Sequence, residues 1–202
     1  YTGAAGLYYI ENFYNGYLGA NYPLSYYFYA GGGAPYYKPA NDANIDNVWE
    51  SEDMNPEEWG SFIKSDAEIC ALYGLNYAAY EGGPDLSLLS NGETIGEDIN
   101  SDPRMGEEVL EHHMVWNENG GGLFVYYALA QDYKFGFAED IFNFNTPKLN
   151  AIKTLAESGK NPVTAGRPVN TEIFGNDYDY FNESVGTEWM GNTLRMEQGF
   201  ET

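Results

Sequence analysis

Glu81 is the residue of this sequence that is best placed to do chemistry. It follows residues 75–80, an apolar run that predicts a short strand, and it precedes Gly82 and Gly83. In parallel α/β proteins, ligands bind at the carboxyl ends of the strands, where the connecting loops converge. The two glycines allow a steep turn and leave room beside the carboxylate. There Glu81 could act as a nucleophile or protonate a glycosidic oxygen, or it could cap or pair within an ordinary loop.

Residues 42–53 have the spacing of a calcium-binding loop. Asp42, Asn44 and Asp46 stand at positions 1, 3 and 5 of such a loop, and Asp53 stands at position 12. Hard oxygen ligands at this spacing suit Ca²⁺, but position 6 is Asn47 instead of glycine and no helix precedes the loop. The alternatives are a structural calcium site and a solvated acidic loop, and we expect no other cofactor.

Tyrosine is unusually frequent, with 19 residues, many of them between Tyr8 and Tyr37. The ordinary explanation is packing, because tyrosine buries its ring and leaves its hydroxyl in water. The alternative is a sugar-binding surface, since flat rings stack on the apolar faces of pyranoses. Four tyrosines are the candidates for contact with a sugar: Tyr29, Tyr80, Tyr127 and Tyr133.

Strands and helices are predicted to alternate along the chain and to position these residues. Apolar runs predict strands at 24–30, 75–80 and 123–130, with loops over 35–55 and 84–102. Each helix is predicted to begin at a capping residue followed by proline: Asn55-Pro56, Asp102-Pro103 and Thr146-Pro147. The second helix carries Met105, Val109, His112 and Trp116 on one face. This order favours an α/β fold with a parallel sheet and right-handed crossovers.

Composition narrows the classes of function. The chain has 202 residues and a formal charge of −22, which disfavours nucleic acids and anionic membranes as partners. With 43% hydrophobic residues it has enough apolar material for a folded core. We find no apolar run long enough to span a membrane, and the single Cys70 excludes an intramolecular disulfide. Because the sequence opens at Tyr1 without a leader, we interpret it as a processed product or a fragment.

Four motifs occur in register: Tyr80-Glu81-Gly82-Gly83, Asp102-Pro103-Arg104-Met105, Gly120-Gly121-Gly122-Leu123-Phe124 and Thr146-Pro147-Lys148. Together they resemble the C-terminal part of a family of secreted bacterial proteins labelled cellulose-binding. That family is similar to retaining glycoside hydrolases with (β/α)8 barrels. The resemblance covers roughly residues 20–158 and implies the C-terminal portion of a TIM barrel over residues 1–159. An irregular, acidic and aromatic extension would then occupy residues 160–202.

The resemblance implies that Glu81 matches the nucleophile on barrel strand seven. A retaining mechanism needs a second carboxylate about 5 to 5.5 Å away, which such barrels carry on strand four. That strand has no counterpart here, and Glu11 is the only acid at an early position. The acid/base is therefore not identifiable in this chain. Another chain or segment would have to complete the barrel, because a half barrel leaves open sheet edges.

The resemblance also implies a function. We expect a secreted, carbohydrate-active protein that acts on or binds an extracellular polysaccharide or oligosaccharide. Whether it is an enzyme stays open at this point. The alternative is a non-catalytic glycan-binding or structural extracellular subunit, such as a filament subunit, on the same fold.

Overall fold

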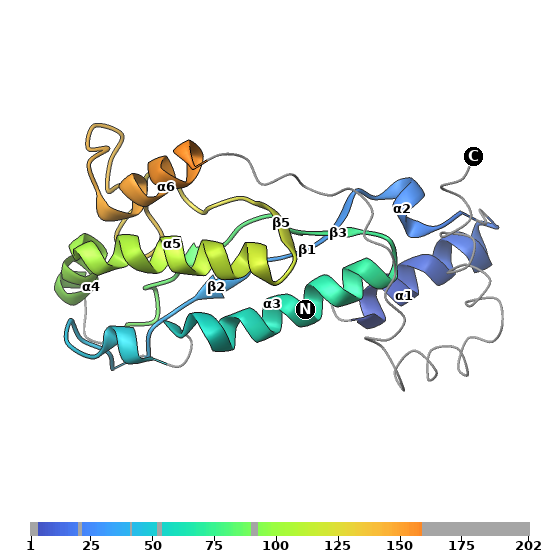
Figure 1. Ribbon diagram of the computed structural model, residues 1–202, viewed down its shortest axis with the longest axis horizontal. Helices are drawn as coiled ribbons and strands as arrows, with labels where there is room; N and C mark the ends of the chain where they lie inside the picture. The colour runs from blue at the N-terminus through green and yellow to red at the C-terminus, as the bar shows by residue number, and fades with distance from the viewer. Residues whose placement is uncertain (1–3, 20–21, 41, 52–53, 90–92, 159–202) are drawn as a thin grey trace. The chain divides into compact units, whose positions relative to one another are not determined.

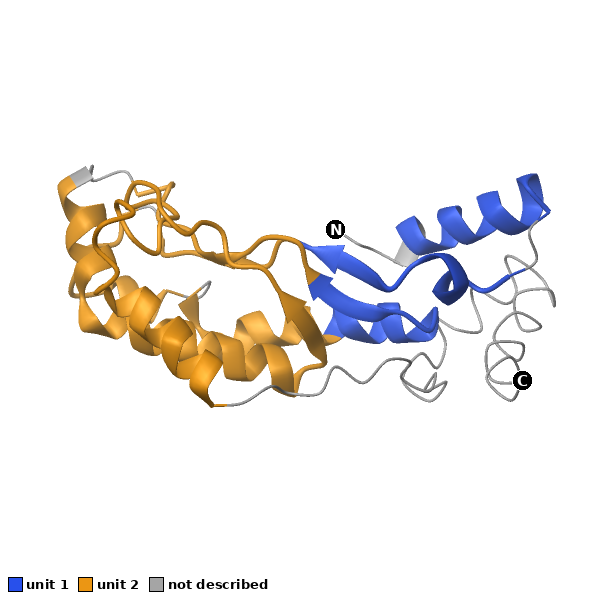
Figure 2. Cartoon of the chain, turned by 90° about the horizontal axis from the view of Figure 1, so that it is seen from above, with its two compact units in different colours: residues 1–33, 65–78, 163–202 blue, residues 34–64, 79–162 orange. Residues whose placement is uncertain are grey.

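The computed structural model describes residues 4–19, 22–40, 42–51, 54–89 and 93–158. The chain divides into two compact units, coloured blue and orange in Figure 2. Unit 1 consists of Tyr1–Gly33, Ser65–Ala78 and Val163–Thr202, and unit 2 consists of Ala34–Lys64 and Ala79–Pro162. Helix α3 (Pro56–Leu72) contributes residues to both units.

Unit 1 contains α1 (Ala4–Asn12), the π-helical segment η1 (Phe13–Tyr17), α2 (Leu24–Tyr27), β1 (Ala30–Gly33) and most of β3 (Asn76–Ala79). The backbone N–H and the side-chain amide of Asn76 both donate to the Tyr29 carbonyl at 3.2 Å. A side chain at Gly31 would place its Cβ 2.5 Å from the Cys70 sulfur. Glycine therefore lets β1 approach the C-terminal part of α3 closely.

The strand predicted at 24–30 is wrong. Residues 24–27 form helix α2, in which Phe28 N–H donates to the Leu24 carbonyl at 2.9 Å. The three glycines that follow the predicted strand, Gly31, Gly32 and Gly33, belong to β1. Aromatic residues favour strands where they pack on a half-buried sheet surface. Tyr26 is 66% exposed, so it does not pack on a sheet surface. Its strand propensity therefore does not determine the conformation of this segment.

Unit 2 contains α4 (Glu93–Ser101), α5 (Pro103–Glu118), α6 (Pro147–Glu157), β2 (Tyr36–Tyr37), β4 (Gly83–Pro84), β5 (Gly121–Phe124) and the 3-10 segment η2 (Val48–Glu50). Strands β2 and β4 pair in parallel, with Tyr36 opposite Gly83. Beyond the end of β5, Val125 N–H donates to the Ala79 carbonyl at 3.1 Å. The loops predicted at 35–55 and 84–102 are wrong where they hold β2, η2, β4 and α4. The strand predicted at 123–130 begins earlier and ends at Phe124.

The three predicted helix starts are confirmed. The capping bonds join Glu57 N–H to Asn55 Oδ1 at 2.9 Å, Arg104 N–H to Asp102 Oδ1 at 2.9 Å, and Leu149 N–H to Thr146 Oγ1 at 3.2 Å. Each bond satisfies a donor of the first helical turn that has no partner within the helix. Beyond the ends of α3 and α5, Gly74 and Gly120 take positive φ angles of 69° and 94°, which favour glycine.

The core of unit 2 follows the predicted face of α5, on which Met105, Val109, His112 and Trp116 are all buried. Met105 packs with Val48, Leu86 and Ile99 in one cluster. Val109 packs with Phe137, Leu149 and Ala151 in another, which joins α5 to α6. Figure 1 shows these two helices side by side.

Gly106 allows α5 and α6 to pack closely together. We predict that Gly106→Ala destabilises the protein. A Cβ at this position would lie 2.8 Å from the Pro147 carbonyl oxygen, which is backbone and cannot rotate away. Overpacking of this kind costs about 1–3 kcal/mol of the free energy of unfolding. Urea denaturation followed by circular dichroism measures the loss. The control is Gly16→Ala, which meets nothing within 4 Å; equal stability of the two variants would contradict the prediction.

The described residues form a mixed α/β structure with small sheets, in which β2 and β4 run parallel. The partial (β/α)8 barrel over residues 1–159 stays a prediction. The acidic extension at 160–202 lies outside the described residues. In the part of the chain that is described, no helix is both long and apolar enough to cross a membrane.

Candidate functional site

Glu81 lies two residues after the end of β3, in unit 2, and its side chain is half-buried. The Tyr36 hydroxyl lies near enough to its carboxylate for the two groups to interact electrostatically. Burial raises the pKa of Tyr36 above its ordinary value of 10.0, and the negative charge of Glu81 raises it further. Tyr36 is therefore protonated at neutral pH, and its O–H is available as a donor beside the Glu81 carboxylate.

Aromatic rings border this pair. The Phe135 ring lies edge-on to Tyr36, with centroids 5.7 Å apart, and edge-on to Tyr127, with centroids 5.6 Å apart. The backbone N–H of Tyr127 donates to the Gly82 carbonyl at 3.0 Å, which holds this segment against the turn after Glu81. Tyr127 is 39% exposed, so the ring remains available to a ligand.

Asp85 brings a second carboxylate to the same tyrosine. Its charge also raises the pKa of Tyr36, after burial, Glu81 and Tyr127. One of its oxygens accepts from Ser87 N–H at 2.8 Å, and its own N–H donates to the Tyr37 carbonyl at 2.9 Å. We define the Glu81 site as Glu81, Tyr36, Asp85, Tyr127 and Phe135.

Gly82 and Gly83 were predicted to allow a steep turn and to leave room beside the carboxylate, and only the turn is confirmed. Gly83 has a φ of 121°, so the steep turn after Glu81 does require glycine. The space that the missing side chains leave is filled, however. A Cβ on Gly82 would lie 2.8 Å from the Phe124 ring, and one on Gly83 would lie 3.3 Å from the Tyr126 ring. The glycines therefore admit packed aromatic rings as well as turning the backbone.

The other predicted sugar contacts are divided between the two units. Tyr80 is 65% exposed in unit 2, and Tyr29 is 59% exposed in unit 1. Tyr133 packs against the first core cluster of unit 2, where a Cβ on Gly96 would lie 2.1 Å from its ring. Of the four tyrosines, Tyr127 is the one that the described contacts tie to the Glu81 site.

Glu11, the early acid, lies in unit 1, whereas Glu81 lies in unit 2. It is 3% exposed, and its charge adds to burial in raising the pKa of Tyr73. These contacts identify it as an interior residue of unit 1.

Local hydrogen bonds shape the predicted calcium loop. Asn44 Oδ1 accepts from Asp46 N–H at 2.9 Å, and Asn44 N–H donates to Asn47 Oδ1 at 2.7 Å. Asp42 and Asp46 are exposed, and Asp53 lies outside the described residues. Within the described ranges, no three His, Cys, Asp or Glu residues are grouped to hold a metal ion. The calcium site stays a prediction.

A second group of ionisable residues lies buried along α5. His112 Nδ1 donates to the Glu108 carbonyl at 2.9 Å, and the imidazole stacks on Tyr37 with centroids 3.6 Å apart. Burial lowers the pKa of His112 to about 4, whereas burial and then the charges of Glu111 and Glu107 raise the pKa of Glu108 to about 7. Although Glu108 Oε2 lies 3.4 Å from Nδ1, the two groups are not charged at the same pH. They form part of the core.

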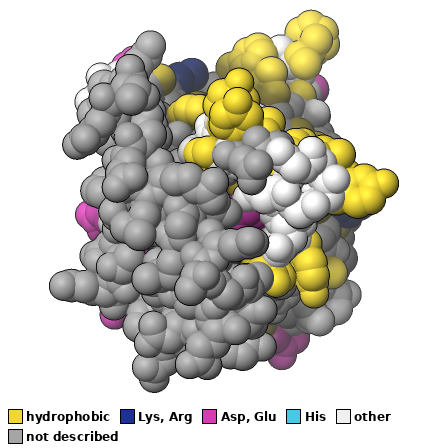
Figure 3. Space-filling view, turned by 90° about the vertical axis from the view of Figure 1, so that its right-hand side faces the viewer, with side chains coloured by type: hydrophobic (Ala, Val, Ile, Leu, Met, Phe, Trp, Pro, Cys, Tyr) yellow, Lys and Arg dark blue, Asp and Glu magenta, His cyan; other side chains and the backbone are white. Residues whose placement is uncertain are grey.

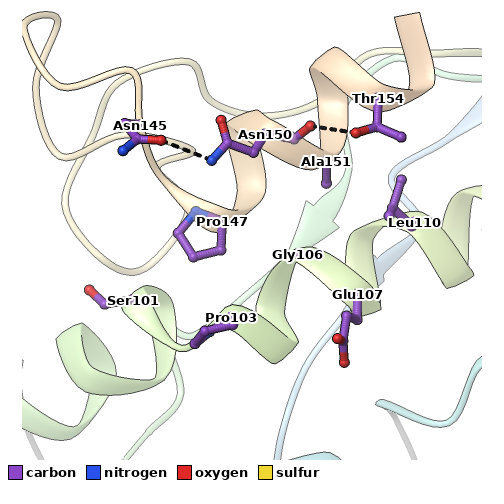
Figure 4. A pocket seen from close by; sticks show the side chains of 10 residues that line it. All are labelled: Ser101, Pro103, Gly106, Glu107, Leu110, Asn145, Pro147, Asn150, Ala151 and Thr154. Carbon is purple, nitrogen blue, oxygen red and sulfur yellow. Dashed lines mark hydrogen bonds between the residues drawn. The ribbon is translucent and has the colours of Figure 1, made fainter. Parts of the chain in front are cut away.

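A groove of about 530 Å³ lies between α5 and α6, as Figure 4 shows. Asn150 Nδ2 donates to Asn145 Oδ1 at 3.1 Å across one end of it, and Glu107 is the one charged residue in its lining. It shares no lining residue with the Glu81 site. The Glu81 site, with two carboxylates and aromatic rings, is the stronger candidate.

Comparisons with family models, with curated proteins and with solved structures gave no match to this chain. The assignment of function therefore rests on the residues and on the geometry of the Glu81 site.

Proposed function

We propose that this chain is a carbohydrate-active protein of the retaining glycoside hydrolase type, which acts on extracellular polysaccharide at the Glu81 site. One observation carries the proposal: the Glu81 carboxylate lies beside the Tyr36 hydroxyl, whose pKa its charge raises, and the rings of Phe135 and Tyr127 adjoin this pair. A carboxylate next to aromatic rings, of which Tyr127 is exposed, suits a sugar, whose apolar face stacks while its anomeric carbon meets the carboxylate.

In this proposal Glu81 attacks the anomeric carbon, and the glycosidic bond breaks as the covalent glycosyl-enzyme forms. Water then displaces the sugar and regenerates the carboxylate. The leaving oxygen takes its proton from a carboxylic acid about 5 to 5.5 Å from Glu81. We assign that acid to another segment or chain that completes the site, in keeping with a secreted barrel protein. Tyr36 holds the attacking oxygen in position.

Glu81→Gln should lower turnover by at least about 10³-fold, because the amide cannot act as a nucleophile. The full chain is assayed for reducing ends released from hydroxyethylcellulose, glucomannan and xylan, and binding of the same polymers is measured in parallel. Binding should persist in the variant. The matched control is Glu97→Gln, which removes an exposed carboxylate of α4. Turnover that survives Glu81→Gln would show that the nucleophile is wrongly assigned.

A second candidate is a non-catalytic glycan-binding protein on the same site. It is favoured by Asp85, the other carboxylate of the site, because one of its oxygens already closes a local turn with Ser87. An activated 2-deoxy-2-fluoroglycoside distinguishes the two, since it traps a nucleophile as a covalent adduct visible by mass spectrometry. Binding without an adduct, abolished by Tyr127→Ala with Phe135→Ala, would favour the binding protein.

A further inference from the structure

Six aromatic rings of unit 1 form a continuous cluster that we call the aromatic platform: Phe13, Tyr14, Tyr17, Tyr22, Tyr26 and Tyr27. Phe13 and Tyr17 stack with centroids 5.4 Å apart and ring planes 14° apart. Tyr22 and Tyr26 stack at 4.5 Å and 16°. The platform therefore presents two nearly parallel pairs of rings, one from η1 and one that includes α2.

A third pair joins the first two. Tyr14 stacks on Tyr27 at 4.5 Å, lies edge-on to Phe13 at 5.9 Å, and is half-buried. Tyr27 in turn lies edge-on to Tyr26 at 5.0 Å. Each ring is held in place by another ring. Binding a ligand therefore costs less side-chain conformational entropy than binding to isolated tyrosines would.

The outer rings are open to solvent. Tyr17 is 80% exposed, Tyr26 is 66% exposed, and Phe13 and Tyr22 are each 51% exposed. A stacked ring has a partner on one face, so this exposure lies on the other face and the edges. Figure 3 shows hydrophobic side chains gathered on the surface of the molecule. A contiguous exposed apolar surface of this kind marks a binding site.

Charge identifies the ligand class. Before Lys38, the only charged side chain in the sequence is Glu11, and that side chain is buried. The platform is thus uncharged in a protein whose formal charge is −22. That charge repels phosphate polymers and anionic lipid, and it equally repels a second copy of the same chain. A neutral ligand with apolar faces and many hydroxyl groups remains, because tyrosine offers both a flat ring and a polar O–H.

We propose that the aromatic platform binds a single chain of neutral polysaccharide, as a site additional to the Glu81 site. Sugar rings stack on the open faces of Tyr17 and Tyr26, and their hydroxyls bond with the phenol groups. The platform needs no carboxylate and does no chemistry. It retains the polymer on the protein whether or not the Glu81 site cleaves it.

Affinity electrophoresis of the full chain tests this proposal. Native gels contain hydroxyethylcellulose or glucomannan, which are neutral, or carboxymethylcellulose, which is anionic. We expect retardation by at least one neutral polymer and less by the anionic one. The double change Tyr17→Ala with Tyr26→Ala should weaken the apparent affinity about tenfold or more. The matched control is Tyr9→Ala, which is 69% exposed on α1 and lies outside the platform.

Further variants separate the possible outcomes. Tyr17→Phe with Tyr26→Phe keeps both rings and should retain most of the binding, which guards against a folding defect in the alanine variant. Glu81→Gln should be retarded like the wild type, so that failure of the platform and failure of the proposed catalytic function are distinguishable. The proposal is overturned if neither neutral polymer retards the wild type. It is also overturned if the alanine variant binds normally, or if sedimentation shows that these tyrosines instead hold two copies together.

Discussion

Trp116→Ala should lower the free energy of unfolding by about 3–5 kcal/mol. The indole is fully buried, lies perpendicular to the Phe124 ring with centroids 4.9 Å apart, and donates from Nε1 to the Gly122 carbonyl at 2.8 Å. The backbone of Gly121 lies directly against it, where a Cβ would be 2.1 Å from a ring atom. The change therefore leaves a large cavity and a carbonyl without its donor.

Urea denaturation at neutral pH measures this loss. Leu123→Ala is the matched control, because Leu123 lies in β5, the strand that contacts the indole, but is 56% exposed, and the change should alter stability by no more than about 0.5 kcal/mol. Trp116→Phe should fall between the two, since it keeps much of the volume and loses the hydrogen bond. If Trp116→Ala lowers the free energy of unfolding by less than about 1 kcal/mol, the core of unit 2 is not built around α5.

Lys148→Met should raise the free energy of unfolding by about 2–4 kcal/mol at pH 6. The lysine is fully buried at the start of α6, and its Nζ lies 5.3 Å from the centre of the Phe137 ring. Among the described residues, Nζ has no hydrogen-bond partner. Burial lowers the pKa of Lys148 to about 7, so the folded protein bears the cost of a buried charge in acidic solution.

The sign of the pH dependence follows from this pKa. The lysine has a pKa of about 10.4 in the unfolded chain, so between pH 7 and 10 the unfolded state binds more protons than the folded state. Stability of the wild type rises with pH across this window, and the advantage of Lys148→Met shrinks. Thermal melts of the wild type and of Lys148→Met from pH 6 to 10 measure this difference in stability. Lys153→Met is the control, at an exposed position of the same helix. A pH-independent advantage would rule out a buried titrating amine.

The helix starts were predictable from sequence because their signals are local. Asn55, Asp102 and Thr146 each precede a proline, and each accepts the hydrogen bond expected of a capping side chain. The apolar face of α5 was equally readable, because a period of 3.6 residues repeats over about three turns from Met105 to Trp116. These features need no knowledge of what the helix packs against.

The errors arose where distant contacts outweigh local pattern. The aromatic run before Ala30 has strand propensity, yet it forms α2 and supplies exposed rings. Helix α4 was missed because its sequence is mostly polar and buries chiefly Ile99 and Asn100.

The Glu81 site was half predictable. Glu81 and Tyr127 were proposed from sequence, and Gly83 was correctly assigned to a steep turn. Tyr36 was missed because it comes to Glu81 through the pairing of β2 with β4, two-residue strands far apart in sequence. A tyrosine pair followed by lysine gives no local sign of that pairing. The contacts of Phe135 with Tyr36 and Tyr127 depend on the same long-range arrangement.

The division into interleaved units has a consequence for how the chain is made. Among the described residues, the polypeptide passes from one unit to the other after Gly33, Lys64 and Ala78. A growing chain therefore emerges from the ribosome with pieces of both units and with neither finished. Contacts between such distant segments form only after long loops have closed, which slows folding. Until then the high negative charge keeps nascent chains apart.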